Sequence, residues 1–98
     1  MSKVDYHPHL LARMEQRGIS TAEIEHTLEA GWEATDAKPG TRGKVCVFDF
    51  HQEWQGCFYE EKEVRVYYKD AKDDLIILTA VARYGSSFAR SSNDEDRI

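Results

Sequence analysis

Hydrophobic residues in the first third of the chain recur at helical spacing. The first group follows Pro8 and consists of Leu10, Leu11 and Met14. Proline suits the first position of a helix because its missing N–H would have no partner there, and Gly18 is typical of a helix end. The run S-T-A-E that begins at Ser20 is a capping box, and it predicts a second helix that Gly31 ends. The pattern therefore predicts two helices within residues 8–31.

From about residue 45 the period changes to the alternation that is typical of β-strands. Residues 45–50 are expected to place Val45, Val47 and Asp49 on one face and Cys46, Phe48 and Phe50 on the other. Residues 64–69 alternate in the same way, whereas Leu75–Ala82 is apolar on both sides, as expected of an inner strand. Residues 51–56 are expected to form a loop, and the polar residues 70–74 a hairpin turn. The pattern predicts at least three strands, with Leu75–Ala82 inside the sheet.

These elements predict an α+β fold, with two N-terminal helices packed on an antiparallel sheet of three to five strands. The length of 98 residues suits one domain, which we place at residues 1–85. Residues 86–98 are mostly small, polar and charged. They are expected to form a flexible C-terminal tail that is mobile after about residue 91.

The composition, with 41% hydrophobic and 32% charged residues, is that of an ordinary globular domain. The longest apolar run, Leu75–Ala82, is too short to cross a membrane, and the first residues lack the pattern of a secretion signal. Cys46 and Cys57 match no common metal or redox spacing and are expected to be reduced, half-buried thiols. These features favour a soluble, cytoplasmic protein that makes no membrane contact.

Charge is unevenly distributed along the chain, whose formal net charge is −5. Residues 23–36 contain five acidic residues and no lysine or arginine, so this segment alone accounts for the net charge. Residues 37–48 contain Lys38, Arg42 and Lys44 and no acidic residue. The acidic balance disfavours a general coating protein for nucleic acids, whereas the segregation predicts one acidic helix and one basic region.

Three polar residues of the first predicted helix, His9, Arg13 and Arg17, recur every four residues along one edge of its hydrophobic stripe. An imidazole beside two guanidinium groups suits phosphodiester chemistry, because arginine binds phosphate oxygens in a bidentate way and histidine transfers protons near neutral pH. Spacing alone favours a plainer interpretation, a solvated helix face whose arginines pair with carboxylates.

A second group of residues has the chemistry of an RNA-binding surface. The basic residues Lys38, Arg42 and Lys44, together with Lys62, could hold a backbone phosphate. Tyr67 belongs to a set of aromatic residues that could stack on unpaired bases. The plainer interpretations are a solvated loop, solvated strand edges and aromatic side chains in the core.

Motifs of the commonest metal-dependent and hydrolytic enzymes are missing. The four histidines are accompanied by no cysteine pair or acidic cluster that would complete a tetrahedral metal site. The sequence contains neither a G-x-x-x-x-G-K-[ST] phosphate loop nor a G-x-S-x-G nucleophile elbow. We therefore expect no metal and no cofactor, and exclude the usual nucleotide hydrolases and esterases.

The run H-P-H-L-L-A-R-M-E-Q-R-G-I-S, from His7 to Ser20, resembles the opening of a family of small bacterial proteins, the domain of unknown function 4258. The resemblance continues through E-W-Q-G-C-F-Y-E-E-K-E-V at residues 53–64 and through L-T-A-V-A-R-Y-G near the end, and covers about residues 5–85. The spacing of the polar row in the first run carries most of its specificity.

The resemblance implies a domain similar to the barnase, colicin and RelE-type ribonuclease toxins, which cut RNA without metal by attack of the 2′-hydroxyl on the adjacent phosphate. That reaction needs a base, an acid and cations that stabilise the phosphorane charge. The resemblance assigns these roles to His9 as acid or base, Arg13 and Arg17 as phosphate ligands, and Lys62 as the stabilising cation. The acidic net charge departs from such toxins, many of which are basic.

Two functional hypotheses remain open at this point. In the first, the chain is a metal-independent endoribonuclease of toxin type that acts on RNA phosphodiesters and is held in check by a neutralising protein partner. In the second, the same scaffold is a non-catalytic module that binds protein or RNA, with the acidic second helix as its working surface. An enzyme requires His9, Arg13, Arg17 and Lys62 to converge on one anion-binding pocket. The sequence does not determine the oligomeric state.

Overall fold

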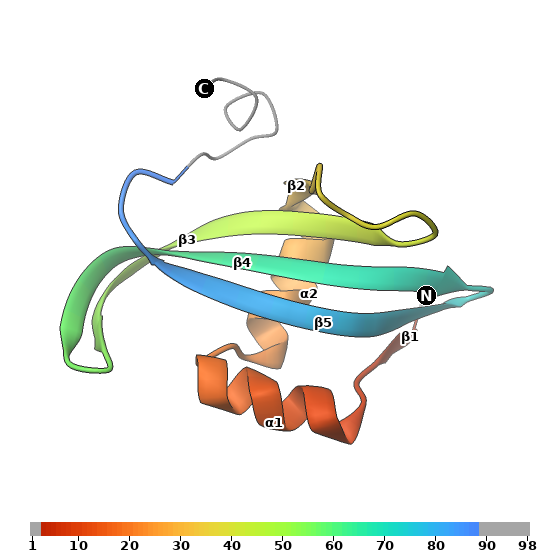
Figure 1. The fold of residues 1–98 in the computed structure, drawn as a ribbon, viewed down its shortest axis with the longest axis horizontal. Coiled ribbons are helices and arrows are strands. Elements are labelled where there is room, and N and C mark those ends of the chain that lie inside the picture. Colours follow the sequence, from red (N-terminus) through yellow and green to blue (C-terminus); the bar gives the residue numbers. More distant parts are fainter. Residues whose placement is uncertain (1–2, 89–98) are drawn as a thin grey trace.

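The computed structural model of the protein describes residues 3–88. In chain order the elements are β1 (Lys3–Asp5), α1 (Pro8–Arg17), α2 (Thr21–Ala30), β2 (Trp32–Glu33), β3 (Arg42–Trp54), β4 (Cys57–Ala71) and β5 (Asp74–Gly85). Figure 1 shows α2 crossing one face of the sheet, while α1 lies alongside β5. The tail predicted at residues 86–98 is described only as far as Phe88, and its remainder lies outside the described residues.

The sheet has five strands in the order β1-β5-β4-β3-β2, which confirms the predicted α+β class. Strands β2 to β5 are antiparallel, but β1 pairs with β5 in parallel, so the sheet is mixed and not purely antiparallel. A strand of three residues is too short to show alternation in a sequence. Because β5 lies between β1 and β4, the strand order confirms that Leu75–Ala82 is internal, although β1 pairs only with residues 74–76 of β5.

The ends of both helices follow the local signals in the sequence. Helix α1 begins at Pro8, and Gly18, with φ 73°, closes it in the left-handed conformation that favours glycine. At the start of α2, the Ser20 Oγ accepts a hydrogen bond from the Glu23 amide at 3.1 Å, and Glu23 Oε1 accepts one from the Ser20 amide at 2.9 Å. The predicted capping box is therefore confirmed.

The hydrophobic core lies between the helices and the two central strands. Its fully or nearly buried members are Leu10, Met14, Ile19 and Ile24 from the helical segment, and Val64, Val66, Tyr68, Ile77 and Ala80 from β4 and β5. These strand residues define the helix-side face of the sheet. The opposite side we call the helix-free face.

The hairpin of β3 and β4 is longer than the sequence pattern predicts. Residues 51–56 were expected to form a loop, but β3 continues to Trp54, and the turn contains Gln55 and Gly56. A register shift between Asp49 and Gln52 interrupts the alternation, which explains why this stretch resembles a loop in sequence. Figure 1 shows the hairpin curling back toward the end of α1.

The two thiols differ in exposure. Cys46 is buried on β3, whereas Cys57 is exposed at the start of β4, and both are reduced. The prediction of two half-buried thiols is therefore wrong about their burial, although right about their redox state. The difference arises because Cys46 pairs with Val64 in the centre of the sheet, while Cys57 follows the hairpin turn directly.

Candidate functional site on the helix-free face of the sheet

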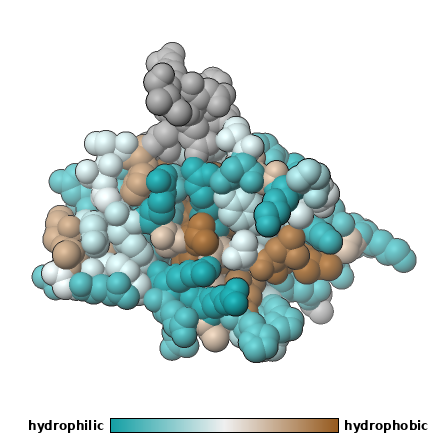
Figure 2. Space-filling model, viewed as in Figure 1, coloured by the Kyte–Doolittle hydropathy of each residue, from teal (hydrophilic) through white to brown (hydrophobic). Residues whose placement is uncertain are grey.

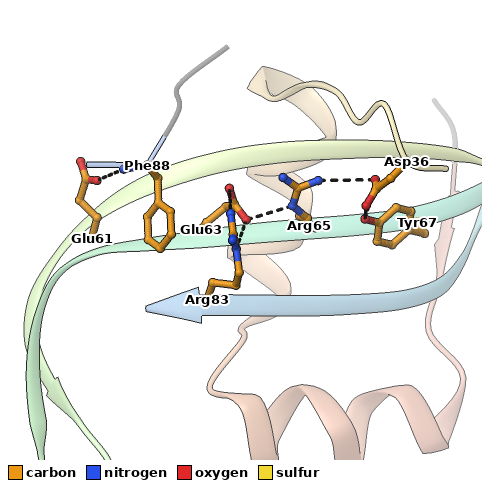
Figure 3. Close-up of polar contacts among 7 residues, drawn as sticks. All are labelled: Asp36, Glu61, Glu63, Arg65, Tyr67, Arg83 and Phe88. Carbon is orange, nitrogen blue, oxygen red and sulfur yellow. Dashed lines mark hydrogen bonds and ion pairs between the residues drawn. The ribbon is translucent and has the colours of Figure 1, made fainter. Parts of the chain in front are cut away.

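Alternate residues of β4 point to opposite faces of the sheet. Val64 and Val66 belong to the core beneath the helices, and Lys62 hydrogen-bonds to the helical segment, so these three residues define one face. Glu63 and Arg65 therefore point to the helix-free face, as the period of two in a strand requires. Figure 3 shows their side chains in front of the sheet, with the helices behind it. The chain thus places charged residues on both sides of its central strand.

Lys62 is buried on the helix-side face, within β4. Its ammonium donates hydrogen bonds to the Gly18 carbonyl and, at 2.8 Å, to Glu23 Oε1. It also lies 5.7 Å and 5.6 Å from the ring centroids of Phe50 and Tyr84. Lys62 therefore binds the carbonyl end of α1, where a cation is favoured, and links it to the first turn of α2.

The polar row on α1 is divided between two environments. The Arg17 Nη1 donates a hydrogen bond of 2.7 Å to the carbonyl of Ala80 on β5. His9 and Arg13 are exposed, and the His9 ring stacks on His7 with 5.1 Å between centroids. Within residues 3–88, no hydrogen bond or ion pair joins His9 or Arg13 to Lys62. The structure brings Arg17 and Lys62 to the same corner of the fold, whereas His9 and Arg13 face outward.

The end of α1 is also enclosed by aromatic residues. The Tyr84 hydroxyl donates a hydrogen bond of 2.7 Å to the Arg17 carbonyl, and the ring of Trp54 stacks on Tyr84 with centroids 5.0 Å apart. Burial raises the pKa of Tyr84 to about 12, so this hydroxyl keeps its proton at neutral pH. The corner near Lys62 is therefore a packed structural junction.

The predicted RNA-binding residues lie on two different faces. Arg42 lies opposite Tyr68 in the strand register, and Lys44 lies opposite Val66, which places both on the helix-side face. Both pair with Glu33, at 2.6 Å and 3.3 Å respectively. The hydrogen bond from Arg42 lowers the pKa of Glu33. Exposed ion pairs of this kind contribute roughly 0–1 kcal/mol to stability.

Glu63 forms the centre of a charged cluster on the helix-free face. Its side chain is 1% exposed and lies between two arginines from neighbouring strands (Figure 3). Arg83 Nε and Nη2 donate to the two carboxylate oxygens at 2.8 Å and 3.0 Å, and Arg65 Nε donates at 3.0 Å. Burial alone would raise the pKa of Glu63, but the hydrogen bonds from Arg83 and Arg65 hold it below its ordinary value of 4.5. The carboxylate is therefore ionised at neutral pH.

The cluster continues across the sheet in both directions. On one side, Arg65 Nη1 lies 3.5 Å from Asp36, and the Tyr67 hydroxyl donates to the same carboxylate at 2.9 Å. Burial and the hydrogen bond to Asp36 raise the pKa of Tyr67. On the other side, the Phe88 ring centroid lies 5.1 Å from the Arg83 Cζ. Figure 3 shows this series of polar contacts running along β4.

A hollow of about 320 Å³ borders this cluster. Its lining residues are Asp36, Lys38, Thr41, Tyr67, Leu78 and Thr79. Lys38 and Tyr67, two of the predicted RNA-binding residues, therefore meet in one place. The hollow and the arginine pair share Asp36 as a common neighbour.

Sequence analysis did not identify Glu63, Arg65 and Arg83 as site residues. The alternation in residues 64–69 already placed Arg65 and Tyr67 on one face. To find the cluster, one must know that Glu63 pairs with Arg83 across β4 and β5. This pairing depends on the register of the two strands. A one-residue shift of that register would separate them.

The described part of the chain holds neither a metal site nor a membrane-spanning helix. Among residues 3–88, no group of three or more histidine, cysteine, aspartate or glutamate side chains is arranged to hold a metal ion. Neither α1 nor α2 is long and apolar enough to cross a lipid bilayer. The charged cluster around Glu63 and the adjoining hollow are therefore the features whose chemistry we interpret.

Comparison with known proteins identifies a family. The model of a family described as a domain of unknown function (DUF4258) matches residues 6–82, which span both helices and most of the sheet. No curated protein and no solved structure matches the chain, so the likeness to ribonuclease toxins stays a prediction. The family resemblance of the first run is confirmed, and the chain belongs to the DUF4258 family.

Proposed function

We propose that this domain cleaves RNA phosphodiester bonds without a metal, at the helix-free face of the sheet where Glu63, Arg65 and Arg83 meet. One observation carries the proposal: an ionised, buried carboxylate is held between two guanidinium groups on a face that the helices leave uncovered. The predicted likeness to metal-independent ribonuclease toxins supports the same chemistry.

The two arginines supply the phosphate site. A guanidinium group donates two parallel hydrogen bonds to a phosphate as readily as to a carboxylate, so an RNA phosphate competes with Glu63 for Arg83. The Arg83 side chain is 60% exposed, which leaves it room to turn toward an incoming phosphate. Both guanidinium groups would then neutralise the charge that develops on the phosphorus oxygens.

Glu63 acts as the base in this proposal. While both arginines donate to it, the lowered pKa of Glu63 makes the carboxylate a weak proton acceptor. When a phosphate draws Arg83 away, one of the interactions that lower this pKa is lost and the carboxylate becomes more basic. Binding of the substrate therefore prepares the group that must accept the 2′-hydroxyl proton.

The bond changes balance with two protein groups. The 2′-oxygen gives its proton to Glu63 and forms a bond to phosphorus, and the bond between phosphorus and the 5′-oxygen breaks. The leaving 5′-oxygen takes a proton from the hydroxyl of Tyr67, which is linked to Arg65 through Asp36. The products are a 2′,3′-cyclic phosphate and a free 5′-hydroxyl. No metal or external reductant or oxidant enters the reaction.

The polar row on α1 offers a weaker phosphate site. For Lys62 to bind an anion there, its buried ammonium would have to leave both Glu23 and the Gly18 carbonyl. Breaking a buried pair of this kind is costly, typically about 3–5 kcal/mol. On the helix-free face, Arg83 is already 60% exposed, and Glu63 keeps the hydrogen bond from Arg65 when Arg83 turns to a phosphate, which favours that face.

The proposal is tested by incubating the purified protein with single-stranded RNA in the presence of EDTA. We expect cleavage that leaves cyclic phosphate ends, reduced about 100-fold or more by Glu63→Gln because the base is lost. Arg83→Lys keeps the charge but loses bidentate binding, and should weaken both binding and cleavage. His9→Ala and Arg13→Ala are the matched controls on the outward part of α1, and should leave cleavage unchanged.

Two results would contradict this assignment. Cleavage that survives Glu63→Gln but disappears in His9→Ala would move the site to α1. RNA binding that depends on Arg83, without cleavage by any form of the protein, would favour the second candidate, a non-catalytic RNA-binding module. The low basicity of Glu63 in the unbound protein is the observation that keeps this candidate open. Thermal unfolding of each variant would show that the folded state is retained.

A further inference from the structure

The hollow next to the arginine pair has the size of a small ligand site. Its volume of about 320 Å³ is near the lower limit of ligand pockets, which suits one planar ring system better than an extended molecule. Figure 2 shows hydrophobic residues gathered over part of β5 on the viewed face, among hydrophilic ones. Leu78, which lines the hollow, is 44% exposed there. Part of the wall is thus apolar and accessible.

We infer that this hollow binds the base of the nucleotide whose phosphate lies at Arg65 and Arg83, and that it selects guanine. The inference rests on the proposed function and names its substrate class. Position supports it first, because Asp36 lies in the hollow and also contacts Arg65 at 3.5 Å. A base in the hollow would therefore be adjacent to a phosphate on the arginine pair.

The walls of the hollow suit an unpaired base. Tyr67 offers an aromatic ring and Leu78 an aliphatic side chain, and unpaired RNA bases are commonly held by stacking on such groups. The Tyr67 hydroxyl is fixed by Asp36 at 2.9 Å, which holds the ring in one orientation before the base arrives. Stacking alone does not distinguish the four bases, because every base has an aromatic face.

The polar groups of the hollow, Asp36 and Lys38, distinguish guanine from the other bases. The Asp36 carboxylate is an acceptor whose two oxygens have about four lone-pair sites. The single hydroxyl hydrogen of Tyr67 occupies one of them at a time and Arg65 Nη1 another, so about two remain for a ligand. Guanine presents two adjacent donors, N1–H and the 2-amino group, which match the two oxygens of one carboxylate. Its O6 acceptor lies on the same edge, where the ammonium of Lys38 provides a donor.

The other bases present a poorer match to this donor and acceptor set. Adenine and cytosine each place a ring nitrogen acceptor beside their amino donor, so one lone pair would face the Asp36 carboxylate. Uracil has a single N–H between two carbonyl oxygens, and both oxygens would be repelled. Unpaired acceptors facing a carboxylate are unfavourable, so the hollow discriminates against all three.

The inference is tested by titrating guanosine 3′-monophosphate, adenosine 3′-monophosphate and inorganic phosphate into the full protein by calorimetry. We expect the guanosine nucleotide to bind about tenfold more tightly than the adenosine nucleotide, which corresponds to one good bidentate contact. Asp36→Asn should abolish that preference while the adenosine nucleotide still binds. Asp73→Asn, which removes the same charge from the exposed turn between β4 and β5, is the matched control and should keep the preference.

The outcomes separate this inference from the proposed function. Equal affinity for the two nucleotides, with both weakened by Arg83→Lys, would overturn guanine selection and leave the phosphate site standing. Absence of binding by either nucleotide and by phosphate would overturn both. A guanosine preference that survives Asp36→Asn would show that the hollow does not read the base, and would also refute the inference.

Discussion

Lys62 and Glu63 are neighbouring charged residues that are both buried, at 2% and 1% exposure. A buried charge is tolerated only when it is paired and hydrogen-bonded, because its loss of hydration is otherwise too costly. Adjacent positions on a strand point to opposite faces, so each residue has its own partners. Lys62 pairs with Glu23 on the helix-side face, and Glu63 pairs with Arg65 and Arg83 on the other.

The difference between these two pairs decides which one has a functional interpretation. The partners of Lys62 are the carboxylate of a capping box and a main-chain carbonyl, both required by the ends of the helices. The partners of Glu63 are the side chains of Arg65 and Arg83, and the Arg83 side chain is largely exposed. An anion can therefore replace Glu63 at Arg83 without disturbing any helix or strand.

The lowered pKa of Glu63 predicts how the free energy of unfolding depends on pH. Because its pKa is lower in the folded protein than the ordinary value of 4.5, ionisation stabilises the folded state. This contribution is complete above about pH 4.5 and is lost as the pH falls through the lower, folded pKa. Urea unfolding of the wild type between pH 3 and 6 should show this loss, and Glu63→Gln should reduce the slope.

The control for this measurement is Glu33→Gln, which removes another carboxylate with a lowered pKa from an exposed ion pair. Its effect should be smaller, since water and salt screen exposed pairs. A pH dependence below 4.5 that is the same in wild type and Glu63→Gln would contradict the buried pairing. At neutral pH we expect Glu63→Gln to cost about 1.5–3 kcal/mol, the usual range for a lost hydrogen bond to a charged group.

At the scale of the elements, the junction between α1 and α2 fixes how the helices meet the sheet. Gly18 ends α1 with φ 73°, its carbonyl binds Lys62, and Trp54 and Tyr84 close over it. A Cβ atom at position 18 would lie 2.7 Å from ring atoms of Trp54 and from the hydroxyl oxygen of Tyr84. The long hairpin of β3 and β4 therefore contacts the helices through a position where only glycine fits.

Gly18→Ala is expected to lower the free energy of unfolding by about 2–5 kcal/mol. The left-handed conformation costs a residue with a Cβ roughly 1–2 kcal/mol, and the clash adds an overpacking cost of about 1–3 kcal/mol. The matched control is Gly56→Ala, because Gly56 also has a positive φ, 87°, but nothing lies within 4 Å of a Cβ there. Chemical denaturation should separate the two variants, and equal losses would contradict the packed junction.

At the scale of the whole molecule, the net charge of −5 opposes long-range attraction to nucleic acid. Arg42 and Lys44 are paired with Glu33 on the helix-side face, so they add little to an anion site on the other face. RNA binding by the helix-free face must therefore depend on close contacts with a few phosphates. This differs from a basic surface that attracts many phosphates at once.

This charge distribution predicts a weak dependence of RNA affinity on salt. Each phosphate neutralised on a single strand contributes about 0.7 to the slope of the logarithm of affinity against the logarithm of salt concentration. One phosphate held by Arg65 and Arg83 together would give a slope of about −0.7, and Arg83→Ala would reduce it. Fluorescence anisotropy with a short labelled RNA measures this slope. A value steeper than about −3, unaffected by Arg83→Ala, would place the RNA elsewhere.

The sequence by itself determined the local parts of this structure. Pro8, Gly18 and the capping box at Ser20 fix the helix ends through bonds between residues at most a few positions apart, and the structure confirms them. The apolar run Leu75–Ala82 correctly indicated an inner strand. The strand is nevertheless not covered on both faces, since Ile76 and Leu78 are exposed. The same reading missed β1 and the bulged part of β3, which are too short or too irregular to show a period.

Only the tertiary structure decided which charged residues meet. A helix places His9, Arg13 and Arg17 in a row, but the packing of α1 on β5 turns Arg17 inward and leaves the other two in solvent. Glu63 and Arg83 are 20 residues apart, and they meet because the register of β4 and β5 sets them opposite each other. Register is fixed by the whole buried face of the sheet, so no local pattern in the sequence reveals this pair.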